Sequence, residues 1–364
     1  MSRWHSAVIL IWIRAAAMFV AMAIAVPAAA QSRAKWQLEF AVGGGPSSTS
    51  PTTTSDLPGA GSAFTTVVDT PSRRIPSWYF GDGAQLVNQV NGALGVASRI
   101  TPLDPVFQRT FADRRQGAMF GIRLSRAITR RFAAQFAVDY GLGRLQVSGP
   151  AVAAVEAARV SFVPALSALI ATGPFTAPSV TSTSTIHEKG GQQIFATGAF
   201  DINFRTSSQA KSIPYITVGG GAKIRIGETP SASLDGEYRF QILGTNPISE
   251  TDKVTIKSSV SDGAVGVIGG GLKYLMSRRW GARFDVRGFI GEETVRTLLD
   301  TRSFSSTTSP TGASASLTSP AVQFSNGGGV SSSLSGQQLA GFRVFERHGL
   351  QTQIDMTAGL FLRF

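Results

Sequence analysis

Few residues of this chain have the types and spacing that catalysis requires. Cysteine is absent, and the only histidines are His5, His187 and His348. His187 precedes Glu188, and a histidine beside a carboxylate can activate a serine in a hydrolase. Serine is so common here that nearness in sequence selects no nucleophile. We therefore expect no enzyme activity, and the two histidines outside the N-terminal region are too few for a metal site. No cofactor is expected.

Charged residues at alternate positions of apolar segments indicate a different chemistry. In an extended strand, alternate side chains point to opposite faces, so these charges would share one polar face. Inside a closed barrel they would either interlock as ion pairs or line a narrow path for ions and small solutes. Glycines of the same face, such as Gly121 and Gly271, would leave room for such a path or let bulky neighbours pack. The predicted interior charges are Glu39, Arg123, Asp139, Asp201, Lys223, Arg225, Lys273, Arg283, Asp285, Arg287, Asp355 and Arg363.

The strands that would position these charges follow from the same period of two. Each predicted strand has an apolar face beside a polar one, as a membrane barrel requires. The predicted strands are 36–43, 120–125, 132–140, 200–204, 216–226, 268–274, 280–290 and 350–364.

The lengths of the connections predict the topology. Short turns fall at 129–131, 206–212 and 277–279, whereas 44–115, 143–192, 227–261 and 291–349 are long. Outer-membrane barrels have short periplasmic turns and long extracellular loops. We therefore predict an all-β fold, an eight-stranded antiparallel transmembrane β-barrel with both ends in the periplasm. The segment Thr129–Val138 also resembles Ser277–Val286, in that a polar and basic turn is followed by an aromatic residue and then by alternation.

The N-terminal residues predict export from the cytoplasm. Arg3 and Arg14 precede or flank a short apolar run, Ala15 to Val26, and three alanines at 28–30 provide a cleavage site. An uncleaved membrane anchor is the alternative. We interpret residues 1–30 as a signal peptide and residues 31–364 as one outer-membrane barrel domain.

The net charge of +12 is spread along strands and turns. We expect the basic residues to pair with anionic lipid and with acidic residues of the barrel interior, and we exclude nucleic acid as a partner.

The last strand, ending Gly359-Leu360-Phe361-Leu362-Arg363-Phe364, completes a pattern that resembles a known family. Together with the alanine cleavage region and the eight strands, it is similar to the small outer-membrane barrels of the OmpA, OmpX and OmpW kind. The resemblance implies that Phe364 is part of the signal read by the barrel-assembly machinery, and that the protein lies in the bacterial outer membrane. The loops are much longer than in compact members. Because the chain ends at Phe364, we expect no peptidoglycan-binding domain after the barrel.

The predicted loops are of two kinds. Residues 46–55, 177–185 and 303–335 are rich in Ser, Thr and Gly and are expected to stay mobile. Residues 84–100 and 151–170 have apolar residues at helical spacing, which predicts short helices in the first and second loops that cap the barrel mouth. They would pack among the loops or form an apolar ligand or partner site. The basic and aromatic run 73–80 suits the head-group boundary or a loop core.

The predicted role is structural or surface-binding, carried by the extracellular loops and any ligand that they engage. The alternative is a narrow porin-like channel for small solutes, and the third hypothesis is an outer-leaflet lipid-modifying enzyme.

Overall fold

A computed structural model describes part of the chain, and the predicted signal peptide lies outside that part. The described residues are 36–47, 77–103, 111–115, 117–173, 175–188, 190–204, 210–242, 247–308, 314–318 and 342–364.

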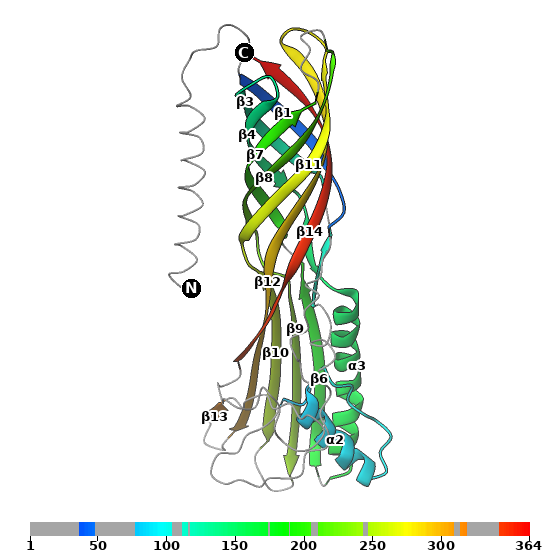
Figure 1. Cartoon of the computed structure of the whole chain (residues 1–364). Coiled ribbons are helices and arrows are strands. Elements are labelled where there is room, and N and C mark those ends of the chain that lie inside the picture. Colours follow the sequence, from blue (N-terminus) through cyan, green and yellow to red (C-terminus); the bar gives the residue numbers. More distant parts are fainter. Residues whose placement is uncertain are drawn as a thin grey trace.

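Eight antiparallel strands close into a barrel (Figure 1). Around the ring the strands follow the order β1-β3-β4-β7-β8-β11-β12-β14, and each is hydrogen-bonded to the next. The pairing of β14 with β1 closes the ring. All eight predicted strands are confirmed, several of them longer than expected. They are β1 (Trp36–Gly44), β3 (Met119–Ala127), β4 (Phe132–Gly141), β7 (Gln192–Asn203), β8 (Ser212–Ile226), β11 (Gly263–Leu275), β12 (Trp280–Thr308) and β14 (Phe342–Arg363).

The stagger of the barrel can be read from its register. From Glu39, one direction around the ring leads through Arg123 and the following strands to Val265 of β11. The other direction, through Phe361, leads to Leu275 of β11, ten residues further along. A shear of ten tilts the strands by roughly 35–45° and leaves an interior that side chains can fill.

The outer surface of the barrel is apolar. Large hydrophobic side chains of all eight strands are exposed, among them Phe40, Ile122, Val138, Phe200, Val218, Ile268, Phe284 and Met356. In water this surface would be costly, and in lipid only a closed sheet satisfies its backbone polar groups. The chain is therefore a transmembrane barrel of the Gram-negative outer membrane, as predicted.

Two periplasmic turns that were predicted to be alike have the same hydrogen bonds. The Thr129 hydroxyl accepts from the backbone N–H of Arg131 and Phe132 at 3.2 and 3.0 Å. The Ser277 hydroxyl accepts from the N–H of Arg279 and Trp280 at 3.3 and 2.9 Å. Trp36 and Phe364 exchange two backbone hydrogen bonds at the same end. The short turns, the start of β1 and the end of β14 all lie at this end of the barrel, at the top of Figure 1, which marks it as periplasmic.

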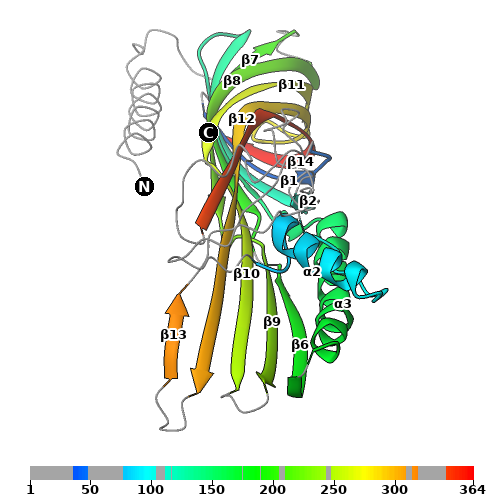
Figure 2. The same ribbon diagram turned by 90° about the horizontal axis from the view of Figure 1, so that it is seen from below.

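At the other end, β12 and β14 continue into a structure that we call the extracellular module. It consists of β6 (Phe175–His187), β9 (Ser231–Ile242), β10 (Ile248–Val260), the distal parts of β12 and β14, β13 (Ser314–Thr318), α2 (Gly81–Ala93), α3 (Gly149–Ala171) and the β2–β5 ribbon (Ala112–Arg115 and Arg144–Val147). The sheet order is β12-β10-β9-β6, and α3 lies against β6 and β9 (Figures 1 and 2).

The helices of the first two loops are confirmed, but they pack on the module sheet and do not cap the barrel mouth as expected. The Ser148 side chain caps α3 by accepting from the Ala151 N–H. α3 is long and apolar enough to cross a membrane by composition, but its buried face contributes Val155, Ala158, Phe162 and Leu166 to the module core. In α2, the core-facing residues are Ala84, Val87 and Asn91, whereas Val90 and Leu94, which directly follows the helix, are exposed.

The aromatic run at 77–80 belongs to the same core, so its described part is a loop core; residues 73–76 lie outside the described residues. Tyr79 stacks on Phe162 with ring centroids 4.6 Å apart and shares a hydrogen bond of 2.8 Å with Ser182. Burial raises the pKa of Tyr79 above its ordinary value, so the phenol stays neutral. The Asp252 carboxylate accepts from the Ser77 hydroxyl and the Trp78 backbone at 2.8 and 2.7 Å.

The expectation that residues 177–185 stay mobile is wrong. They form most of β6, where Val180 and Ile186 pack against the core and alternate Ser and Thr residues face outward. The physical reason is that Thr is β-branched and suits a half-buried strand.

In the 227–261 connection, β9 and β10 form the centre of the module sheet. Of 46–55 and 303–335, only 46–47, 303–308 and 314–318 are described; 303–308 and 314–318 are strand.

The substitution Phe162→Ala should unfold the module and spare the barrel. Phe162 is fully buried, so its loss should cost the module about 3–5 kcal/mol. We expect faster protease cleavage of the module in proteoliposomes, with the barrel still heat-modifiable on gels. Val160→Ala is the matched control, because Val160 lies on the same helix and is 54% exposed. Equal cleavage rates for the two variants would contradict this account.

Candidate functional site

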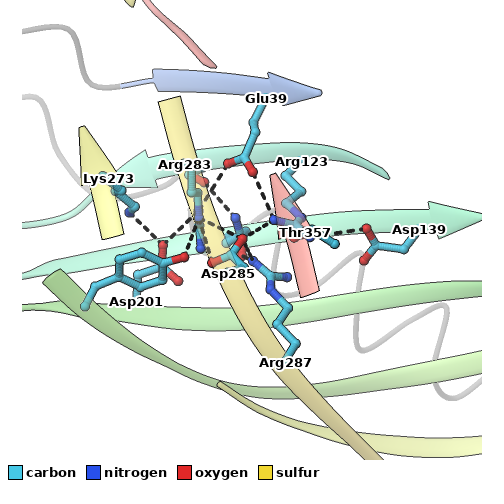
Figure 3. A network of polar contacts seen from close by, with 12 residues as sticks. Glu39, Arg123, Asp139, Asp201, Lys273, Arg283, Asp285, Arg287 and Thr357 are labelled. Carbon is cyan, nitrogen blue, oxygen red and sulfur yellow. Dashed lines mark hydrogen bonds and ion pairs between the residues drawn. The ribbon is translucent and has the colours of Figure 1, made fainter. Parts of the chain in front are cut away.

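The centre of the barrel lumen is held by one acid between two arginines. Glu39 of β1 accepts from Arg123 of β3 at 2.9 Å and pairs with Arg283 of β12 at 3.3 Å (Figure 3). All three side chains are fully buried. Arg123 also bonds Thr357 at 3.1 Å and contacts Asp285. Four strands are therefore joined across the interior.

A second group extends the network toward β7, β8 and β11. Asp201 pairs with Lys273 at 2.8 Å and with Arg283 at 3.3 Å. Tyr215 accepts from the Arg283 Nε at 2.7 Å. Its ring also lies under both cations, 4.6 Å from the Lys273 nitrogen and 4.3 Å from the Arg283 guanidinium carbon. This double cation–π contact adds to the ion pairs in a desolvated site.

Inward glycines make room for these side chains. A Cβ at Gly271 would lie 2.6 Å from the Tyr215 hydroxyl and 3.0 Å from an Asp285 oxygen. A Cβ at Gly121 would overlap an oxygen of Asp139. Of the two alternatives for the glycines, packing of bulky neighbours is thus the one observed at both positions.

On the extracellular side of the central network, part of the lumen wall is apolar. Along β12, the inward positions run from Arg283 through Asp285 and Arg287 to Phe289. Phe289 packs on Phe195 with ring centroids 4.6 Å apart. Together with Val265 and Val267, they form one hydrophobic cluster. All four are buried and form an apolar patch on β7, β11 and β12. The residues paired with the two phenylalanines on the neighbouring strands, Asp139 of β4 and Gln353 of β14, are polar and also buried.

A second ion cluster lies further toward the extracellular side. Glu293 pairs with Lys223 at 3.2 Å and with Arg225 at 2.7 Å. Lys223 also contacts Gln351. Next to this cluster, Gln193 donates to Gln353 at 2.8 Å, and Gln353 donates to Asp355 at 2.7 Å. Arg114 of the β2–β5 ribbon reaches Gln193, so the module contacts the barrel mouth.

The structure brings most of the twelve predicted charges together. Ten are buried, Arg225 is partly buried in the outer cluster, and Arg363 is half-buried 5.4 Å above the Phe361 ring. Arg287 contacts Asp285 at 3.5 Å and donates to Gln135 at 2.8 Å, and Arg123 lies 3.6 Å from Asp139. Sequence reasoning placed Gln135 and Gln351 on the polar face of their strands but missed Glu293, Tyr215, Phe195 and Phe289.

The histidines lie apart from this network. His187 is exposed at the end of β6, and His348 of β14 shares a hydrogen bond of 2.9 Å with Thr294. Within the described residues, no three His, Asp, Glu or Cys side chains gather as a metal site requires. Phe364 is exposed at the periplasmic end.

The arrangement has a clear chemical consequence for the lumen. The opposite charges interlock at direct contact distances, and the paired phenylalanines lie next to them in the same passage. An ion crossing this interior would have to break several charge-assisted hydrogen bonds and pass the apolar patch of Phe195 and Phe289.

Removing Arg283 should destabilise the barrel by about 3–5 kcal/mol, because Glu39 and Asp201 would each lose a buried partner. We expect the Arg283→Gln variant to unfold from lipid vesicles at a lower urea concentration than the parent. Arg363→Gln is the control: Arg363 is interior but forms no salt bridge in the described chain, and its loss should cost about 1 kcal/mol or less. A larger loss for the control would contradict the assignment.

No protein-family model and no curated protein matches the sequence. Solved structures that are similar to this chain include OprG from Pseudomonas aeruginosa, at 8% identity and a TM-score of 0.34, over 91% of this chain and 97% of that one. An outer membrane channel from Pseudomonas putida F1 matches at 9% identity and a TM-score of 0.23, over 93% and 99%. The Pseudomonas putida toluene transporter TodX matches at 11% and 0.18, over 94% and 93%. At these scores, the barrel assignment depends on the strand pairing described above.

Proposed function

We propose that this protein is a non-enzymatic and non-conducting barrel that holds the extracellular module outside the cell, where the module binds an external ligand or partner. The observation that carries the proposal is the module's own hydrophobic core, built from α2, α3 and the β6-β9-β10-β12 sheet. A loop needs no such core to connect two strands. A folded surface supports binding because its groups are ordered before the partner arrives.

The attachment of the module supports the same role. β12 and β14 stay paired without a register shift from Trp280 and Leu362 to Asp300 and Phe342. The same two strands therefore form barrel wall and module sheet (Figure 1). Such a connection fixes the direction in which the module faces.

The filled lumen favours this proposal over a narrow porin-like channel. Glu39, Arg123 and Arg283 are fully buried at the middle of the passage, and Phe195 and Phe289 are buried beside them. A porin-like role would instead need these side chains to part.

Within the outer-membrane barrels, we propose that the chain is of the OmpA, OmpX and OmpW kind, with longer loops. The eight strands support this placement. We also propose that the barrel-assembly machinery reads the last strand together with Phe364, which directly follows it and donates its backbone N–H to Trp36 of β1 at 3.0 Å.

Single-channel recording in a planar bilayer tests the closed lumen. The refolded protein without residues 1–30 should give no discrete openings while migrating as a heat-modifiable barrel. A trimmed barrel, with each long connection replaced by a short turn, should be equally silent, because the interior ion pairs remain. Reproducible openings of the full protein would favour the channel. Openings of the trimmed barrel alone would show that the module, not the lumen, closes the passage.

Complementation tests the role of the module. In cells that lack the gene, the full protein should restore whatever surface property is lost, and the trimmed barrel should not. Phe162→Ala should behave like the trimmed barrel, whereas Val160→Ala should behave like the parent. Full rescue by the trimmed barrel would contradict the binding role and leave support of the envelope as the function.

A further inference from the structure

The periplasmic end of the barrel carries a group of cations that we call the cationic rim. All of them are exposed except Arg126, which is partly buried. Within the described parts of the three periplasmic turns, 126–131, 210–211 and 276–279, no residue is acidic. None of the rim cations forms a salt bridge to a described carboxylate. The rim consists of Arg126, Arg130, Arg131, Lys211, Arg278 and Arg279.

The turns hold these cations outward. In both Arg-Arg turns a hydroxyl satisfies two backbone N–H groups, as described for Thr129 and Ser277. The backbone of each turn therefore needs no help from the arginine side chains. Arg130, Arg131, Arg278 and Arg279 are all exposed.

Aromatic residues set the depth of the rim. Phe132 directly follows Arg131, Trp280 directly follows Arg279, and the Arg126 guanidinium lies 5.3 Å above the Trp36 ring. Exposed aromatic residues gather where a barrel meets the head-group region of the membrane. One residue of strand spans about 3.3 Å, so the rim cations lie within the head-group layer.

The opposite end of the barrel is different, which makes the rim a local feature. Around the extracellular mouth, exposed Glu188, Glu228 and Glu292 are mixed with exposed Arg115 and Arg144. The high net charge of the chain is thus not spread evenly over both membrane surfaces.

We propose that the cationic rim binds the phosphate groups of anionic phospholipids in the inner leaflet of the outer membrane. Guanidinium groups bind phosphate through paired charge-assisted hydrogen bonds. Each cation at an anionic membrane surface strengthens attraction by about fivefold. The depth set by Phe132 and Trp280 favours a lipid over a soluble anion, because the cations lie beside the head groups.

Two tryptophans make the proposal measurable. Trp36 and Trp280 lie at the rim, and Trp78 of the module can be replaced by Phe to remove its signal. The full protein without residues 1–30 is refolded into vesicles of phosphatidylcholine and phosphatidylglycerol, with one of the two lipids brominated. Quenching then reports which lipid lies next to the rim. Equal leaflets make the result independent of the direction of insertion.

We expect phosphatidylglycerol to be preferred by about threefold or more at low salt, and the preference to fall toward one in 1 M salt. The variant with Arg130, Arg131, Arg278 and Arg279 changed to Gln should lose the preference for phosphatidylglycerol. The control changes four exposed cations elsewhere, Arg99, Arg115, Arg144 and Lys257, to Gln and should keep it.

Three results would overturn the proposal. They are no preference in the parent, a preference that salt does not reduce, and an equal loss in the rim and control variants. Heat-modifiability confirms that each variant is folded. Where a variant fails to refold, the salt dependence of the parent's preference for phosphatidylglycerol still tests the proposal.

Discussion

Backbone hydrogen bonding in lipid is the constraint on which this structure depends. Nothing in the hydrocarbon layer can bond a free N–H or C=O, so the first and last strands must pair and the sheet must close. The β1–β14 and β11–β12 ladders make that closure. Once the ring is closed, alternate side chains face lipid or lumen. The lumen of eight strands is narrow, so every charge placed there needs a partner within reach.

The extracellular module is a continuation of the barrel wall. On β12, β11 pairs as far as Gly291, and β10 takes over the same edge from Val295. Only Ser261 and Asp262 connect β10 to β11, so the two strands follow one another along β12. The sheet thereby leaves the ring and opens into a layer that α2 and α3 can cover. Its buried face then needs hydrophobic residues where the barrel interior has charges.

Because each strand has lipid on one side, alternation was sufficient to predict the barrel strands and most of the interior charges, though not Glu293. It could not predict which charges pair: Asp201 and Lys273 are far apart in sequence, and their contact depends on the register around the ring. Phe195 and Phe289 were missed because each has an apolar neighbour, Ile194 or Ile290, which hides the alternation. β9 was overlooked although Ala232, Leu234 and Tyr238 alternate with polar residues, since a long connection was assumed to be irregular.

The unbroken pairing of β12 with β14 also has a mechanical meaning. A ligand that pulls on the module pulls these strands along their own length. Their ladder hydrogen bonds lie across that direction and share the load together, unlike a hairpin that is peeled open one bond at a time. Tension applied outside the cell would therefore reach the membrane-embedded ring without first unfolding a linker.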